Sequence, residues 1–248
     1  MPEVIRVPQE LYRKLRVGMN LKKIFSEEGF LNRDRTSKLL LVSLVLFFIL
    51  APLVEEREVG KLLLILDLYV TLVAATMELA ARPVLFWSAI PIAVSSMVLL
   101  VISHVHSTPP LEIANGTVLA GFLILVSVSL YNYLGHDSAV TKGRLYASVS
   151  LYFMLGLSWF AIYRVMNFVQ PGSFTEGGTP IPVGAHWSTF LYFSLTSLTT
   201  LGYGDILAVK PAARMFATLE AVTGVLYIAI TVARLVSSSQ TEKARDQQ

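Results

Sequence analysis

Residues 199–205 read TTLGYGD, and this short stretch combines two glycines with hydroxyl, aromatic and acidic side chains. Glycine tolerates backbone conformations that other residues resist, so Gly202 and Gly204 indicate that the main chain itself is the working surface. Carbonyl oxygens from Thr200 to Tyr203, together with the Thr200 hydroxyl, could replace the water around a dehydrated cation. Such a site requires neighbouring elements that hold the stretch in a non-helical conformation.

The composition of the chain indicates a membrane protein. Of the 248 residues, 54% are hydrophobic and 15% are charged, which lies outside the usual balance of a soluble globular domain. The net charge of +3 is too small to indicate a nucleic-acid partner, because the basic residues cluster beside apolar segments and resemble topology signals. The absence of cysteine excludes disulfides, thiol catalysis and cysteine-ligated metals.

Six segments have the length and apolarity that a hydrocarbon layer of about 30 Å requires of a helix. The predicted spans are 39–54, 61–80, 83–103, 116–135, 144–168 and 212–236. Placing both termini in the cytoplasm puts 15 Lys and Arg residues on that side and five on the other, in agreement with the positive-inside rule. We therefore expect an all-α membrane protein with six transmembrane helices, located in the cell membrane (plasma or bacterial inner), with both termini cytoplasmic.

The connection between the fifth and sixth spans, residues 170–210, differs from the shorter connections. Residues 187–199 are apolar and aromatic with small hydroxyl residues, too few to cross a bilayer but enough for a re-entrant helix. Non-helical backbone at membrane depth is tolerated only where protein buries it or where it lines a watery path. This connection therefore predicts a re-entrant pore helix followed by a selectivity filter.

Residues 187–236 resemble the pore module of the potassium-channel superfamily, in which a pore helix, a TVGYGD-like filter and an inner helix follow an outer helix. Leucine replaces the commoner valine in the filter here and keeps an apolar side chain behind it. The resemblance implies an ion-binding filter made of Thr200, Leu201, Gly202, Tyr203 and Gly204. Potassium would be the metal ion, held by the first four of these residues, and no other cofactor is implied. Because each chain supplies one filter strand, the resemblance also implies a homotetramer.

The same resemblance implies roles for residues around the filter. Tyr192 and Phe193 occupy positions where family members have aromatic residues that brace the filter, with lipid contact or ordinary core packing as the alternative. Thr196 stands at a pore-helix position that is acidic in some relatives and affects filter stability there. Asp205 would lie at the outer mouth. Gly224 matches the glycine at which inner helices bend to open, with close helix packing as the alternative.

The six-span layout resembles that of voltage-gated channels, whose fourth span carries an arginine at every third position. The fourth span here has no Lys or Arg, so the resemblance does not extend to voltage sensing. The acidic residues of the spans are Asp67, Glu78 and Glu220. Glu78 is expected to pair with Arg82 one turn later. Glu220 is expected to pair with Arg214 or with pore-helix hydroxyl groups, unless its carboxyl group is functional.

The chain is expected to divide into four parts. They are a cytoplasmic N-terminal segment (1–38), a four-helix block without gating charges (39–140), a pore domain (141–238) and a short polar tail (239–248). The first of these mixes apolar and basic residues in a helical period, which predicts an amphipathic helix on the inner leaflet or against the pore helices.

The function that we expect is passive, potassium-selective flux through a membrane pore that is not steeply gated by voltage. A weakly selective monovalent cation channel is the near alternative, because selectivity depends on surroundings that a sequence does not fix. A carrier should have an internal repeat with discontinuous spans in both halves, but residues 1–140 contain no second GYG-like break. The spans also lack a nucleophile with its base or a set of metal ligands, so no enzymatic activity is expected.

Overall fold

The computed structural model describes residues 33–54, 58–81, 83–106, 108–135 and 141–246. The predicted amphipathic helix of the N-terminal segment lies within residues 1–32, outside these ranges. The described part of the chain is an all-α membrane protein with one small sheet added at one end.

Six long helices correspond to the six predicted spans. In chain order they are α2 (Arg33–Val54), α3 (Glu58–Glu78), α4 (Pro83–Val105), α5 (Pro109–Gly135), α6 (Lys142–Val169) and α8 (Pro211–Asp246). A single 3-10 turn, η1 (Leu79–Ala81), follows α3. Within the described residues, α4, α5, α6 and α8 each contain a stretch long and apolar enough to cross a membrane, and α8 continues as a helix beyond its predicted end at 236.

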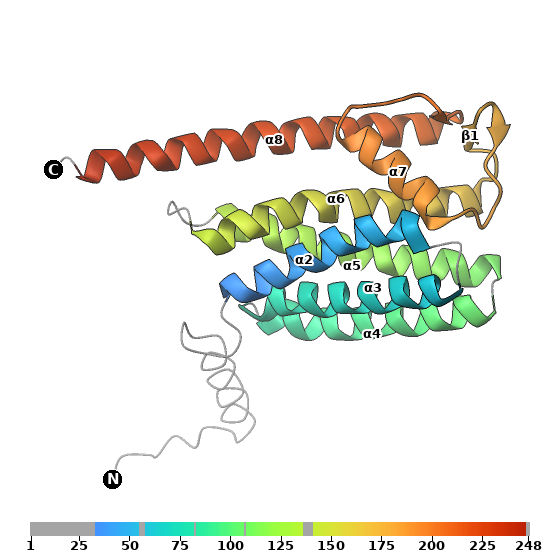
Figure 1. Ribbon diagram of the computed structural model, residues 1–248, viewed down its shortest axis with the longest axis horizontal. Helices are drawn as coiled ribbons and strands as arrows, with labels where there is room; N and C mark the ends of the chain where they lie inside the picture. Colours follow the sequence, from blue (N-terminus) through green and yellow to red (C-terminus); the bar gives the residue numbers. More distant parts are fainter. Residues whose placement is uncertain (1–32, 55–57, 82, 107, 136–140, 247–248) are drawn as a thin grey trace, which may run out of the picture.

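The five helices α2 to α6 form a bundle of roughly parallel and antiparallel rods, and α8 lies along one side of it (Figure 1). The most extensive packing joins α5 to α6, while α2 packs against both α3 and α6. A short helix, α7 (Trp187–Leu198), lies between α6 and α8 and contacts both. The start of α2 and the end of α8 lie at the same end of the molecule, opposite the strands.

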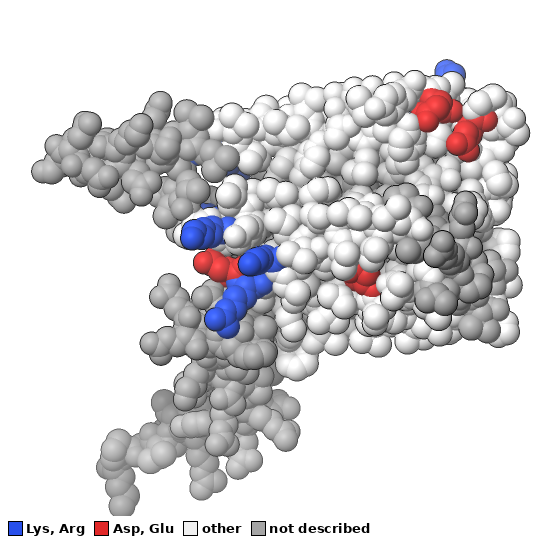
Figure 2. Space-filling view, in the orientation of Figure 1, with Lys and Arg blue, Asp and Glu red and all other residues white. Residues whose placement is uncertain are grey.

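The bundle is apolar inside and outside, as a lipid environment permits. On α2, Leu40, Leu44 and Phe47 are buried at helical spacing, while Val42 and Leu46 on the other side are exposed and just as apolar. Lipid is as apolar as leucine, so close van der Waals packing holds the helices together in place of a hydrophobic driving force. On the face in Figure 2, Lys and Arg gather at the end where α2 begins, and uncharged atoms cover most of the middle.

A three-stranded antiparallel sheet closes the opposite end, and the sequence analysis did not predict it. The strands are β1 (Phe174–Glu176), β2 (Thr179–Pro180) and β3 (Ile206–Ala208), in the order β2-β1-β3. Phe174 pairs with Ala208 and Glu176 with Ile206. The Gly177–Gly178 turn that joins β1 to β2 is a typical two-residue hairpin connection, so the signal is present in the sequence. The sheet fastens the residues after the filter to those after α6.

Candidate functional site: a backbone ion pathway

The pore helix ends where the unusual backbone begins. At the end of α7, the Thr199 amide still donates to the Leu195 carbonyl at 3.0 Å. The Thr200 amide then donates to Ser197, only three residues back, at 3.0 Å. This tightened last turn releases the chain from helical geometry, and residues 201–203 carry no regular secondary structure.

The backbone of the filter segment alternates in hand. Thr200, Gly202 and Gly204 have φ values of +58°, +51° and +80°, whereas Leu201 and Tyr203 are not in the positive-φ region. Alternating left- and right-handed residues direct successive N–H groups to one side of the chain, so the carbonyl oxygens face the other. The Gly202 amide points back to the pore helix, where it donates to the Thr196 carbonyl at 3.1 Å. From this arrangement we infer that the carbonyl oxygens of the segment face away from the pore helix.

Thr200 is the one described non-glycine residue with positive φ, and the sequence analysis did not anticipate its conformation. A β-branched residue is rare in this region and costs on the order of 1–3 kcal/mol. Such strain persists only where the surroundings fix the backbone, and it is concentrated at functional sites. Here the amide hydrogen bond to Ser197 holds the residue in place.

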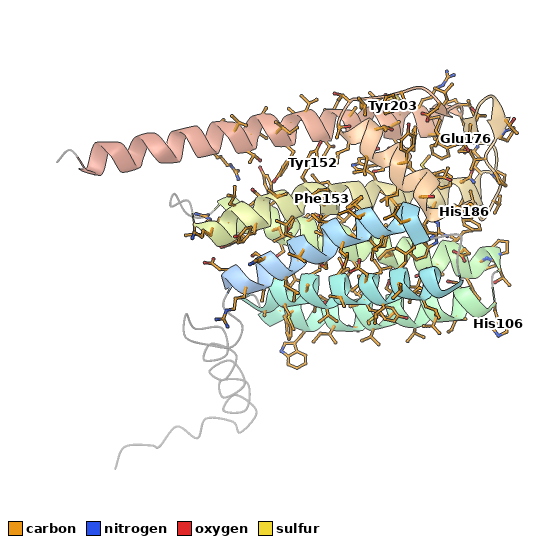
Figure 3. All side chains as sticks on the ribbon, viewed as in Figure 1. His106, Tyr152, Phe153, Glu176, His186 and Tyr203 are labelled. Atoms are coloured by element: carbon orange, nitrogen blue, oxygen red, sulfur yellow. The ribbon has the colours of Figure 1, made fainter. Side chains whose placement is uncertain are left out.

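The side chain of Tyr192 connects the pore helix to the far end of the filter. Its hydroxyl donates to the Asp205 carboxylate at 2.7 Å, and its ring stacks on Tyr203, with centroids 6.4 Å apart and planes 2° apart. The Asp205 carboxylate also accepts a hydrogen bond from the Ile206 amide at 3.0 Å, and Ile206 is the first residue of β3. Figure 3 shows Tyr203 on the side of the molecule away from α3 and α4. Tyr192, predicted as a filter support, thus lies against the filter.

Comparison with known proteins gives the same assignment for this part of the chain. Residues 149–240 match a family model described as "Ion channel". The rat A-type voltage-gated potassium channel KCND3 is 31% identical over 88 residues, which are 36% of this chain and 12% of that protein. Residues 149–240 belong to the potassium-channel superfamily. The assignment points to a channel rather than an enzyme.

Two further potassium channels are similar to this chain over stretches of comparable length. The two pore potassium channel c of Oryza sativa subsp. japonica is 33% identical over 86 residues, 34% of this chain and 18% of that protein. The inward rectifier potassium channel Kirbac3.1 of Paramagnetospirillum magnetotacticum is 30% identical over 77 residues, 31% of this chain and 22% of that protein. The chain thus spans between 12 and 22% of the length of these curated relatives. No solved structure matches it.

The other two predicted filter supports, Phe193 and Thr196, contact the pore helix and its neighbours. Phe193 is buried on the side away from Tyr203, with its ring 5.1 Å from Tyr163 of α6 and 5.3 Å from Phe174 of β1. Thr196 is also buried, and its hydroxyl donates to the Phe193 carbonyl at 3.0 Å. It reaches the filter only by its backbone carbonyl. Phe193 and Thr196 therefore fix the pore helix, and any bracing of the filter by them is indirect.

Gly224 lies where the inner helix α8 packs against the end of the pore helix α7. A Cβ atom added there would overlap the Leu198 carbonyl oxygen at the end of α7. The same oxygen lies 3.4 Å from the Tyr152 hydroxyl, which extends from α6 toward α8 (Figure 3). The geometry supports the close-packing interpretation of Gly224, and its role as a hinge stays a prediction.

Glu220 pairs with hydroxyl groups, which is one of the two pairings expected from the sequence. The carboxyl group is completely buried and contacts Ser194 of the pore helix at 2.6 Å. Its other oxygen accepts from Tyr163 at 2.5 Å, a partner that the sequence analysis missed because Tyr163 lies 57 residues away. Arg214, the other expected partner, donates to the Ala208 carbonyl at 3.2 Å.

Two of the acidic residues of α3, Glu78 and Asp67, lie inside the bundle, away from the filter. Glu78 accepts a hydrogen bond from the Ser37 hydroxyl of α2 at 2.9 Å, and its expected partner Arg82 is outside the described residues. Asp67 is buried, and one of its carboxylate oxygens has no hydrogen-bond partner within the described part of the chain. Both residues therefore contribute to the polar interior of the four-helix block rather than to the ion pathway.

Replacing Tyr192 with phenylalanine is expected to make the outer mouth more sensitive to acid. The hydroxyl of Tyr192 lowers the pKa of Asp205 below its ordinary value of 3.8, and the same bond raises the pKa of Tyr192 to about 12. Because the folded carboxyl has the lower pKa, its stabilising contribution is complete above the ordinary value and is lost as pH falls through the folded value. Without the hydroxyl, this loss should begin at a higher pH.

The measurement is the thermal midpoint and potassium current of the assembled protein between about pH 3 and 6. Tyr146→Phe makes the same change on α6, at the end opposite the filter, and should leave the acid profile unchanged. An identical acid profile for Tyr192→Phe and the wild type would show that the hydrogen bond does not support the outer mouth.

Proposed function

We propose that this chain is the subunit of a homotetrameric channel through which potassium ions pass passively across a membrane. The observation that carries the proposal is the alternation of φ along the filter segment, together with the Gly202 amide that donates to the pore helix. This arrangement favours carbonyl oxygens that face away from the pore helix. Oxygen rings of this kind replace the hydration shell of a potassium ion. One chain supplies only one side of such a ring, so the site is incomplete without further copies.

The exposure of α8 supports assembly around the filter. Of its apolar span only 11% is buried within the chain, compared with 56% for the span of α6. Leu201 and Tyr203 of the filter are 56% and 69% exposed in the single chain. A backbone site at membrane depth must be covered by protein or must line a watery path. Neighbouring copies packed around a central pore would satisfy this requirement.

The experiment that tests the function is ion flux into liposomes that contain the purified protein. If the protein is a potassium channel, the liposomes accumulate potassium, or its analogue rubidium, down a potassium gradient. Sodium accumulates at least about tenfold less under a sodium gradient of the same size. Comparable sodium and potassium flux would favour the weakly selective cation channel instead. Protein mass in detergent, measured by light scattering, tests the tetramer independently of flux.

The orientation is part of the same proposal. The chain is a multi-pass membrane protein, and the clustering of Lys and Arg at the end where α2 begins supports a cytoplasmic location for that end. The filter mouth with Asp205 would then face the opposite side. Potassium would be the only bound ion, with no further cofactor, and the surrounding lipid would contact the exposed apolar sides of α2 to α4.

Opening is expected to depend only weakly on voltage. Helix α5, the counterpart of a voltage-sensing span, contains no Lys or Arg, and each charge that crosses the field gains only about 2.3 kcal/mol per 100 mV. The helix is also fastened to α6 at both ends. Glu112 pairs with Arg164 at 3.1 Å, and Arg144 donates to the Tyr133 and Leu134 carbonyls at 3.2 Å.

This expectation can be measured with the purified protein in planar bilayers over about 200 mV. Currents in symmetrical potassium should change gradually and without a steep threshold. A steep sigmoidal opening curve that persists after the ion composition is changed would contradict the absence of a voltage sensor.

A further inference from the structure

A buried acidic side chain connects the three helices that surround the filter. Glu220 of α8 is completely buried and contacts Tyr163 of the outer helix α6 and Ser194 of the pore helix α7. Ser194 in turn contacts the carbonyl oxygen of Gly156, also on α6, at 2.8 Å. An ionisable group inside a membrane span is costly, which makes a specific role for this cluster the default expectation.

Counting hydrogens in the cluster determines the protonation state that fits it. The distances of 2.5, 2.6 and 2.8 Å are all those of O–H···O hydrogen bonds, so the three contacts require three hydrogens. Tyr163 and Ser194 each supply one, and the Gly156 carbonyl can only accept. An ionised Glu220 would leave one oxygen pair without a hydrogen between them. A protonated Glu220 supplies the third hydrogen to the Ser194 oxygen, whose own hydrogen then reaches Gly156.

The charges around Glu220 agree with a neutral carboxyl group. Among the described residues, the titratable side chains that interact with it are Tyr163 and Tyr152, both from α6. The only titratable group on α7 is Tyr192, whose hydroxyl is bonded to Asp205. On α8, the Arg214 guanidinium donates to a backbone carbonyl instead. A buried carboxylate without a cationic partner is strongly disfavoured, whereas a protonated one with satisfied hydrogen bonds is not.

We propose that Glu220 is a positioning residue that holds a proton at neutral pH and thereby ties the pore helix to the outer and inner helices. The inference deepens the proposed function and rests on it, because the pore helix carries the filter. Loss of the proton at alkaline pH removes one of the three hydrogens and releases Ser194 from either Glu220 or Gly156. The pore helix then loses a fastening point, and potassium flux decreases.

Glutamine distinguishes this proposal from a purely structural role for a carboxylate. In Glu220→Gln, the amide NH₂ can donate to Ser194 and the amide oxygen can accept from Tyr163, so all three bonds are kept without a titratable proton. Glu220→Ala removes both contacts of the side chain. Glu176→Gln makes the matched change at an exposed residue of β1 and serves as the control.

The test has two measurements on the full-length protein in liposomes. In infrared difference spectra against Glu220→Gln, wild type should show the C=O stretching band of a protonated carboxylic acid at neutral pH. As the pH is raised above neutral, wild-type potassium flux should fall reversibly, while flux through Glu220→Gln stays within about twofold of its neutral value. Glu220→Ala should reduce flux at neutral pH by about tenfold, and Glu176→Gln should behave like wild type.

A carboxylate band at neutral pH, or a Glu220→Gln variant that fails to assemble or keeps the alkaline loss of flux, would overturn the proposal. The infrared measurement does not require ion conduction. A protein that shows the band of the protonated carboxyl group but no potassium flux would therefore refute the proposed function, while the protonated state of Glu220 would still be confirmed.

Discussion

Gly202→Ala is expected to abolish selective potassium flux while leaving a folded, assembled protein. The residue has a φ of +51°, where an added Cβ costs about 1–2 kcal/mol in each subunit. Among the described residues, and apart from the glycine and its two chain neighbours, no atom lies within 4 Å of the added Cβ, so conformation rather than collision is the reason for the effect. Relief of the strain would turn the peptide plane, and the carbonyl oxygens that flank it would leave the ring.

Gly172→Ala is the matched control for this prediction. Gly172 has a φ of +75° and equally open surroundings, but it lies in the connection before β1 rather than in the filter. Both variants should lose a similar amount of thermal stability, and only Gly202→Ala should lose selectivity in the liposome assay. Potassium-selective flux through Gly202→Ala would refute the assignment of this segment as the filter.

The sequence predicts the long helices of this fold well, because membrane spans are specified by length and apolarity alone. The pore helix predicted over 187–199 is observed as Trp187–Leu198, and the first span, predicted over 39–54, begins earlier, at Arg33. The filter was recognisable because its glycines are required by backbone conformation. Such a local pattern can be recognised in the sequence without any knowledge of tertiary contacts.

Features that depend on contacts between distant residues were not predictable in the same way. The hydrogen-bond partners of Glu220 come from α6 and α7, 57 and 26 residues away, and many other hydroxyl groups were equally plausible from the sequence. The pairing of β1 with β3 joins segments on either side of the pore helix, and each strand is only three residues long. Periodicity cannot identify strands as short as these.

The directions in which neighbouring aromatic side chains point could not be predicted from the sequence either. Tyr192 and Phe193 are adjacent in the chain and had the same predicted role. In a helix, adjacent residues point in directions about 100° apart, so one faces Tyr203 while the other faces Tyr163 and Phe174. Which of the two faces the filter depends on the rotation of α7 about its axis, and only packing against α6 and α8 sets that rotation.

Gly224→Ala is expected to disable the filter even though the substitution lies on another helix. The added methyl group would overlap the Leu198 carbonyl oxygen at the end of the pore helix, two residues before Thr200. Backbone cannot move aside as a flexible side chain can, so α8 must move outward or the end of α7 must shift. Overpacking of this kind costs about 1–3 kcal/mol per site, and a tetramer would contain four such sites.

The result separates close packing from hinge bending at Gly224. If the residue is needed for packing, Gly224→Ala should lose potassium flux together with the thermal stabilisation that potassium gives to the wild type, because binding to the folded state raises its stability. If it is needed only as a hinge, the filter stays intact. Potassium would then still stabilise the variant, and only the fraction of time spent open would fall.

Gly121→Ala is the control, since Gly121 lies within α5 and an added Cβ there would meet no described atom within 4 Å beyond its neighbours and the nearby backbone of its own helix. Alanine favours a helix over glycine by about 1 kcal/mol, so this variant should be as stable as wild type or slightly more stable, with normal flux. The same gain in helix propensity applies to Gly224→Ala. A loss of stability in that variant alone therefore measures the collision with the pore helix, whereas equal stability of the two variants would show that α8 can move away from Leu198 at little cost.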